Sequence, residues 1–209
     1  MLNAEVSDLS PIHHLLASAV LRVGAGRGFV AEGKDRYIVT AAHCLPTLPD
    51  AMPAAAPYER TYQALVSRLD EQPTAAAECV FVDPVADVAV LGPPDSQDLW
   101  EEYEVYAALI ATCPTFRLGM ANEKCRGWML SLEGRWVACE VNHCGGPLWV
   151  REAAHPIAAG MSGSPIVDDD GGALGIVSIS FGPRHIEGGP NPRLENNLPG
   201  WLLKELYGG

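Results

Sequence analysis

Short apolar runs broken by glycine and proline dominate the hydrophobic pattern of this chain. In the first half they alternate with polar residues or carry β-branched residues, at 19–23, 28–30, 37–40, 79–82 and 85–91. Runs of this length between turn residues are typical of β-strands, and no helical period connects them. The first half is therefore predicted to be mostly β-sheet.

The second half continues the strand pattern and adds helical spacing at its ends. The stretches 127–132 and 135–141 flank a Glu-Gly turn, which predicts a β-hairpin. Apolar residues recur at helical spacing over 98–110, and 199–207 reads as an amphipathic closing helix. The glycine-rich and proline-rich stretch 182–199 is expected to be a surface loop. With no internal repeat and no dividing linker, we expect an all-β single domain with a C-terminal α-helix.

Composition and charge exclude several classes of partner. The 209 residues carry a formal net charge of −12, and the 14 basic residues form no block, so we expect no nucleic acid partner. No window approaches 18 uninterrupted apolar residues, which argues against a membrane partner. Glu5 and Asp8 stand where an export signal carries basic residues. We therefore expect a cytoplasmic protein whose six cysteines are reduced.

Two segments place an ionisable side chain next to a predicted strand. His43 follows the run 37–40, where the strand would hold it at the surface of the domain. Asp87 precedes the apolar run 88–91, so its carboxylate would be partly buried and would need a partner such as an imidazole N–H. A structural histidine and an ordinary turn aspartate are the alternatives.

A third segment carries a serine between glycines. The stretch 160–163 reads Gly-Met-Ser-Gly, and its glycines allow a sharp turn in which the amides of Gly160 and Ser162 converge beside the Ser162 hydroxyl. Such a pair of amides would bind a developing oxyanion. The pattern by itself is weak, but a base, a carboxylate and a nucleophile in the order His, Asp, Ser form the set needed for acyl transfer. An α/β-hydrolase or a subtilisin would show a different order.

These segments resemble the trypsin-like (chymotrypsin-fold) serine peptidases. Residues 40–44 read Thr-Ala-Ala-His-Cys, as in that family, and 87–91 and 160–165 are similar to its aspartate and serine motifs. The stretch 175–178, Gly-Ile-Val-Ser, is similar to the strand beside the substrate backbone. The resemblance covers most of the chain, and the Ser-Gly-Ser-Pro ending of the serine motif looks like bacterial members.

The resemblance implies a double six-stranded antiparallel β-barrel with the site between the barrels. The barrels would span about 16–105 and 106–195, with the closing helix at 199–207. By the same match, His43 is the general base and then the general acid, Asp87 holds its tautomer, and Ser162 attacks the carbonyl carbon. The amides of Gly160 and Ser162 become the oxyanion hole. The implied function is a serine endopeptidase that acts through an acyl-enzyme.

The resemblance also implies a substrate pocket, lined by Pro156 and its neighbours and by Ser178, Ile179 and Ser180. Ser178 would in addition support Asp87. No carboxylate stands at the expected pocket base, so a small or apolar residue is expected before the scissile bond.

Two departures separate this chain from the digestive members of the family. Met161 stands where those members have an aspartate that pairs with a newly cut N-terminus, so activation by propeptide cleavage is not expected. Gly28 is expected to lie where they keep the cysteine that bridges to the residue after the catalytic histidine. Cys44 is therefore expected to be unpaired.

Other functions and ligands remain as alternatives. A protease-like binding or scaffold module would keep the fold without turnover, and an esterase could use the same site. Cys125, Cys139, His143 and Cys144 could supply zinc ligands, but their spacing lacks the paired form of structural sites, so we expect no metal and no cofactor. The expected partner is a protein or peptide substrate, with a regulatory protein as a further candidate.

Overall fold

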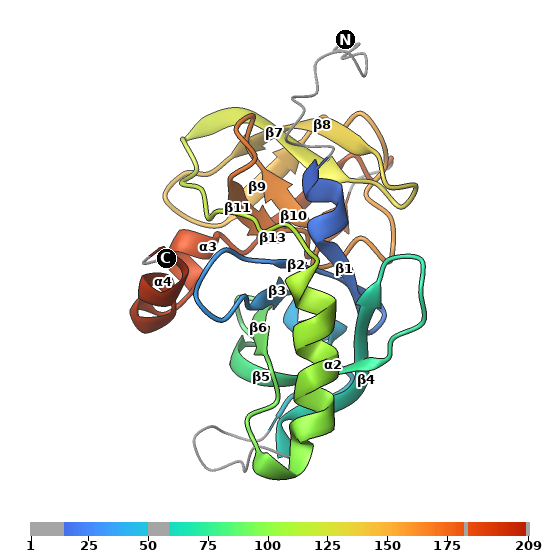
Figure 1. The fold of residues 1–209 in the computed structure, drawn as a ribbon. Coiled ribbons are helices and arrows are strands. Elements are labelled where there is room, and N and C mark those ends of the chain that lie inside the picture. The colour runs from blue at the N-terminus through green and yellow to red at the C-terminus, as the bar shows by residue number, and fades with distance from the viewer. Residues whose placement is uncertain (1–14, 50–58, 182–183, 208–209) are drawn as a thin grey trace.

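Six strands of the first half close into a barrel in the order β1-β2-β3-β6-β5-β4. The computed structural model describes residues 15–49, 59–181 and 184–207. Every neighbouring pair of strands in the barrel is antiparallel. The strands are β1 (Val20–Val23), β2 (Gly26–Val30), β3 (Ile38–Thr40), β4 (Thr61–Arg68), β5 (Ala75–Asp83) and β6 (Val88–Gly92). The barrel occupies the lower half of Figure 1 and confirms the strand pattern of the first half.

The second half forms a seven-stranded sheet in the order β11-β10-β7-β8-β9-β13-β12, which lies above the barrel in Figure 1. Its strands are β7 (Lys124–Leu130), β8 (Trp136–Asn142), β9 (Leu148–Arg151), β10 (Pro165–Val167), β11 (Ala173–Ile176), β12 (Ser180–Phe181) and β13 (Glu187–Asn191). The predicted hairpin is present as β7 and β8, which pair from Lys124–Asn142 to Leu130–Trp136.

The expected double barrel is confirmed as an architecture, but its second half differs in detail from a closed six-stranded barrel. Among the described residues, the edge strands β11 and β12 do not pair with each other. Between them, the Ser178 amide donates to the side-chain Oδ1 of Asn191 at 2.9 Å and not to a backbone carbonyl. That side-chain bond takes the place of a ladder bond and leaves the sheet open there.

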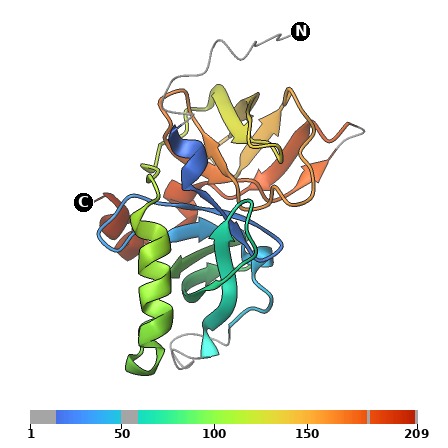
Figure 2. The ribbon, with the colours of Figure 1, turned by 45° about the vertical axis from the view of Figure 1, so that its right-hand side comes forward.

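The 3₁₀ turn η5 (Gln97–Leu99) and helix α2 (Trp100–Ala111) match the helical spacing over 98–110. Figures 1 and 2 show α2 running along the outside of the barrel, where it packs against β5. Its inner face buries Tyr106 and Ile110. The boundary expected near 105/106 therefore falls inside a helix that packs with the first half.

The chain returns to the first barrel at its C-terminal end. Helix α4 (Gly200–Tyr207) confirms the closing helix and buries Leu202 and Leu206. It lies beside the β2–β3 connection, where a Cβ on Gly33 would stand 3.1 Å from the Glu205 carbonyl oxygen. The expectation of a loop over 182–199 was wrong in part: β13 and helix α3 (Leu194–Asn197) form there, and 182–183 lie outside the described residues.

The segment before β7 joins the two halves through Phe116. Phe116 exchanges backbone bonds with the β2 end: its amide donates to Val30 at 2.8 Å, and its carbonyl accepts from Glu32 at 2.7 Å. Its ring is fully buried and meets Phe29 and Trp136 edge to face, with ring centroids 5.1 and 6.4 Å apart. One aromatic contact lies in each half, so this residue fixes the halves against each other.

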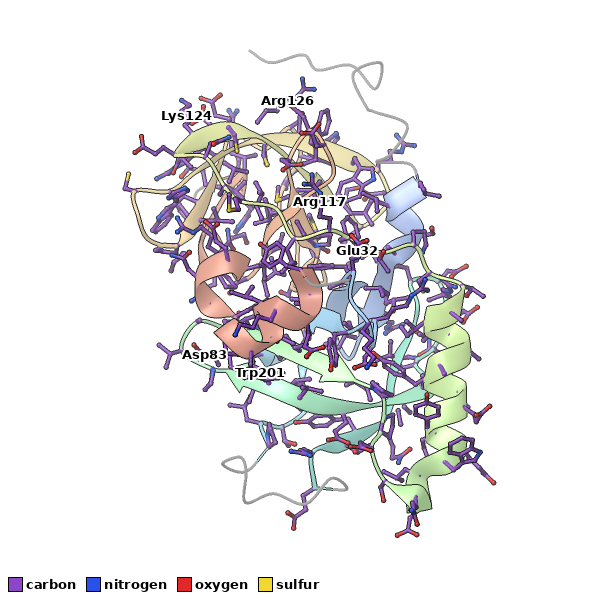
Figure 3. All side chains as sticks on the ribbon, turned by 60° about the vertical axis from the view of Figure 1, so that its left-hand side comes forward. Glu32, Asp83, Arg117, Lys124, Arg126 and Trp201 are labelled. Carbon is purple, nitrogen blue, oxygen red and sulfur yellow. The ribbon has the colours of Figure 1, made fainter. Side chains whose placement is uncertain are left out.

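The outer face of the second sheet carries paired charges. Lys124 and Arg126 project from β7 at the far end of the sheet (Figure 3), and they pair with Glu140 at 2.7 Å and Asp169 at 3.7 Å. In the described ranges, the helices are too short or too polar to cross a membrane.

Candidate active site

His43 and Asp87 meet between the ends of β3 and β6. His43 lies in the 3₁₀ turn η3 (Ala42–Cys44), directly after β3. Its Nδ1 is 2.8 Å from Oδ2 of Asp87, and its backbone amide donates to Oδ1 at 3.0 Å. Because an ionised carboxylate only accepts, Nδ1 carries the proton and Nε2 keeps a free lone pair. The imidazole is half exposed to solvent, and the carboxylate is 22% exposed.

A tight turn positions Asp87, and the hydroxyl of Ser178 binds its carboxylate. Oδ1 of Asp83 accepts the amides of Val85 and Ala86, so Asp83 is the turn aspartate of this segment. Asp87 follows at φ +59°, a backbone conformation that non-glycine residues seldom adopt. The Ser178 hydroxyl, from the second half of the chain, donates to Oδ2 of Asp87. The carboxylate thus accepts bonds from both halves of the fold.

Ser162 lies on a turn between two glycines with positive φ angles. Gly160 and Gly163 have φ of +92° and +80°. Met161, Gly163 and Ser164 each donate their amide to a backbone carbonyl. Among the described residues, the amides of Gly160 and Ser162 donate to no protein group. These two N–H groups therefore have no partner within the described part of the chain.

The carbonyl of Ser162 ties the serine turn to the first barrel. It accepts the Arg27 amide of β2 at 2.7 Å and lies 3.6 Å from Sγ of Cys44, the residue after His43. The serine turn therefore lies next to the residue that follows His43, at the junction of the two halves. Within the described part of the chain, the Ser162 hydroxyl forms no hydrogen bond, either to the imidazole or elsewhere. Catalytic hydrogen bonds of this kind often tighten only with substrate bound.

Comparison with known proteins identifies the family. The model of the trypsin-like peptidase domain matches residues 26–176, well over half of the chain. The chain belongs to the trypsin-like peptidase family. It is a serine-type endopeptidase by that membership, in agreement with the resemblance of the sequence motifs. No curated protein matches the chain significantly.

Solved structures share the fold of this peptidase at low identity. The M. tuberculosis protease Rv3671c in its inactive form is 19% identical, with a TM-score of 0.59 and coverage of 93% of this chain and 92% of that one. The serine protease of human pathogenic astrovirus is 18% identical, with a TM-score of 0.58 and coverage of 90% and 97%. At this identity the likeness concerns the double-barrel fold alone.

Cys44 faces Gly26 and not Gly28, which corrects the expectation from the family resemblance. A Cβ built on Gly26 would stand 2.4 Å from Sγ of Cys44, whereas one on Gly28 would meet Ile38 and Val23. Residues two apart on a strand lie on the same face, so the motif match alone could not decide which of Gly26 and Gly28 lies opposite Cys44. Cys44 is a free thiol, as expected, and so are the other five cysteines.

Met161 shapes the serine turn through packing. Its side chain is 2% exposed and belongs to the core of the second sheet, with Met129 and Val177. Its Sδ accepts the Ala158 amide at 3.3 Å. An apolar anchor therefore stands where digestive relatives use an ion pair.

The residues expected to line the substrate pocket differ in exposure. Ile179 is 50% exposed, Pro156 is also exposed, and Ser180 is partly buried at the start of β12. Ser178 is buried and directed to Asp87, so its position suits support of the carboxylate better than contact with substrate. Sequence reasoning missed Gly188, where an added Cβ would lie 2.9 Å from Cδ1 of Ile157 and 2.7 Å from the Ile179 carbonyl.

Two further residues at the site were not anticipated from the sequence. Asn191 holds the Ser178 amide, and nothing in its local pattern indicated that role. Arg27 binds the Ser162 carbonyl through its backbone. The available signal was a cation between two glycines, between the predicted runs 19–23 and 28–30.

His143, one of the residues considered as a zinc ligand, has other partners. His143 places Nε2 2.9 Å from the Ala121 carbonyl and Nδ1 2.6 Å from Nη1 of Arg193. Because a carbonyl only accepts, Nε2 carries the proton and Nδ1 accepts from the guanidinium. In the described ranges, no three potential ligands gather in a metal-binding arrangement.

Proposed function

We propose that this chain hydrolyses peptide bonds through His43, Asp87 and Ser162 by way of an acyl-enzyme. The observation that carries the proposal is the pair of bonds from His43 to Asp87, through Nδ1 and the backbone amide. They leave Nε2 as the proton acceptor on the side open to solvent. The free amides of Gly160 and Ser162 support it further.

In the first step, Ser162 Oγ attacks the scissile carbonyl carbon while Nε2 of His43 takes the hydroxyl proton. The carbonyl oxygen becomes an oxyanion that accepts bonds from the amides of Gly160 and Ser162, each worth about 100- to 1,000-fold in rate. When the C–N bond breaks, the imidazolium gives its proton to the leaving amine. Water then attacks the acyl-enzyme while Nε2 of His43 takes a proton from that water. The imidazolium returns the proton to Oγ of Ser162 when the ester bond breaks.

Fluorophosphonate labelling tests this assignment against that of a silent binding module. The wild type should be modified at Ser162, and Ser162→Ala should lose the label. Ser164→Ala is a matched control because Ser164 is a fully buried serine two residues away. Asp87→Asn should lower kcat by about 10,000-fold, since the amide favours the wrong tautomer of His43. A folded wild type that neither labels nor cleaves casein would refute the proposal.

We further propose that the peptidase prefers a small or apolar residue before the scissile bond. Ile157 is buried beside Gly188, and neither Ile157, Ile179 nor Ser180 offers a charge to a substrate side chain. Cleavage of a peptide library would contradict this preference if basic or acidic residues dominated that position. The cytoplasmic location and the regulatory partner remain predictions of the sequence.

A further inference from the structure

Arg27 is a buried cation at the junction of the two halves. Arg27 is only 6% exposed, and the other residues of its strand, β2, are small or apolar. Burial lowers the pKa of its guanidinium below the ordinary value, and the nearby charge of Glu133 opposes that shift. Within the described ranges, no carboxylate forms an ion pair with it. A buried cation without a paired anion is costly, so some other interaction must favour it here.

The guanidinium reaches across the junction to the turn between β7 and β8. Its Nη1 donates to the carbonyls of Leu130 and Ser131, both at 2.9 Å, and its Nη2 donates to that of Leu132 at 3.2 Å. These acceptors lie more than 100 residues away in the chain. The guanidinium is planar and carries its N–H donors in fixed directions, so it can donate to three successive carbonyls at once.

The same turn lies against the expected oxyanion hole. Cδ2 of Leu132 would lie 3.5 Å from a Cβ built on Gly160, which is ordinary van der Waals distance. Gly160 contributes one of the two free amides. The side chain of Arg27 thus fixes the turn that packs against one wall of the site.

The backbone of Arg27 holds the other wall. Its amide donates to the Ser162 carbonyl at 2.7 Å, and its own carbonyl accepts the Thr40 hydroxyl at 2.6 Å. That carbonyl also approaches Gly163 so closely that a Cβ there would stand 1.9 Å away. Thr40 is the last residue of β3, three residues before His43. One residue therefore touches the serine turn, the histidine strand and the β7–β8 turn.

We propose that Arg27 is a positioning residue for catalysis, which sets the amides of the serine turn relative to His43 by clamping the β7–β8 turn across the junction. This inference rests on the proposed function, because it assigns Arg27 to the same site. Misplacement of a reacting group by about 1 Å can cost on the order of 100-fold in rate. Loss of the guanidinium should therefore lower kcat by about 10- to 100-fold, with KM little changed.

Arg27→Met and Arg27→Lys test the inference, with Arg36→Met as the matched control. Arg36 also donates from Nη1 to three carbonyls, those of Ile110, Ala111 and Cys113, but it does so at the end of α2. All variants are measured at a temperature at which circular dichroism shows them folded. Arg27→Met should lose kcat and label slowly at Ser162, whereas Arg36→Met should lower only Tm. Arg27→Lys keeps the charge but not the planar set of donors, so its kcat should lie between those of the wild type and Arg27→Met.

Chemical rescue separates positioning from general stabilisation. Millimolar guanidinium should restore part of the kcat of Arg27→Ala, and potassium chloride at equal ionic strength should not. Wild-type kcat in Arg27→Met, an equal loss in Arg36→Met, or failure of both Arg27→Met and Arg27→Lys to fold would overturn the inference. A wild type that fails to label would instead refute the proposed function, and this inference with it.

Discussion

Replacing Gly26 by alanine would place a methyl carbon where the fold has no room for it. The new Cβ would stand 2.4 Å from Sγ of Cys44 and 2.7 Å from the carbonyl oxygen of Ser162. The first separation is about 1 Å shorter than an ordinary contact between heavy atoms. Neither neighbour can move freely, because Cys44 is packed in the barrel core and the Ser162 carbonyl accepts the Arg27 amide. Removing the clash therefore requires a shift of the backbone.

The size of the effect follows from those contacts. Overpacking of a filled core costs about 1–3 kcal/mol in the free energy of unfolding, which corresponds to roughly 2–4 °C of Tm per kcal/mol for a domain of this size. A shift of the Ser162 carbonyl would also move the hydroxyl, so we expect kcat/KM to fall by about 10- to 100-fold. Calorimetry measures the first quantity, and peptide hydrolysis measures the second.

A second substitution separates the two contacts. Cys44→Ala in the Gly26→Ala background removes Sγ but leaves the contact with Ser162, so Tm should recover more than activity does. Gly146→Ala is the matched control, because a Cβ at Gly146 meets nothing within 4 Å. Wild-type Tm and kcat/KM in Gly26→Ala would show that the junction is not packed as described.

Further predictions concern the carboxylate, the thiols and the core. Ser178→Ala should lower kcat by about 10- to 150-fold, since a hydrogen bond to a charged group is worth about 1.5–3 kcal/mol; unchanged kcat would remove Ser178 from the site. Ellman's reagent should modify the exposed Cys144 first in the native protein, and Cys144→Ser should lose that fast phase. Burial raises the pKa of the Cys79 thiol to about 11, so the folded state keeps a proton that the unfolded chain loses near pH 9. The free energy of unfolding should therefore fall as the pH rises from about 9 to 11, and Cys79→Val should flatten that fall in chemical denaturation. Phe116→Ala should cost about 3–5 kcal/mol in urea denaturation, because its fully buried ring packs against both halves.

Local patterns predicted most of the secondary structure. Apolar runs such as 37–40 and 88–91 became β3 and β6, and the closing helix appeared within a residue of its expected start. The stretch 182–199 was wrongly predicted to be a loop throughout because its prolines and glycines are typical of loops, although β13 forms there with Gly188 and Gly189 in the strand. Those glycines are needed for close approach to Ile179 and Trp149, a demand that composition does not reveal.

The residues of the candidate site also fall into those that local motifs indicate and those that they do not. His43, Asp87 and Ser162 could be proposed from short motifs, because each motif encodes a local conformation that presents its side chain. Asn191 and Arg27 could not be assigned roles, since their partners lie in other segments of the chain.

The sequence by itself determined most of the strands and the family, and it supplied the residues proposed for catalysis, because those inferences depend on side chains within a few positions of one another. Only the tertiary structure decided that Gly26 faces Cys44, that Asn191 holds the Ser178 amide and that Arg27 joins the two halves. The reason is physical: these contacts are set by how two sheets pack, and packing places together residues whose separation along the chain carries no information about their distance in space.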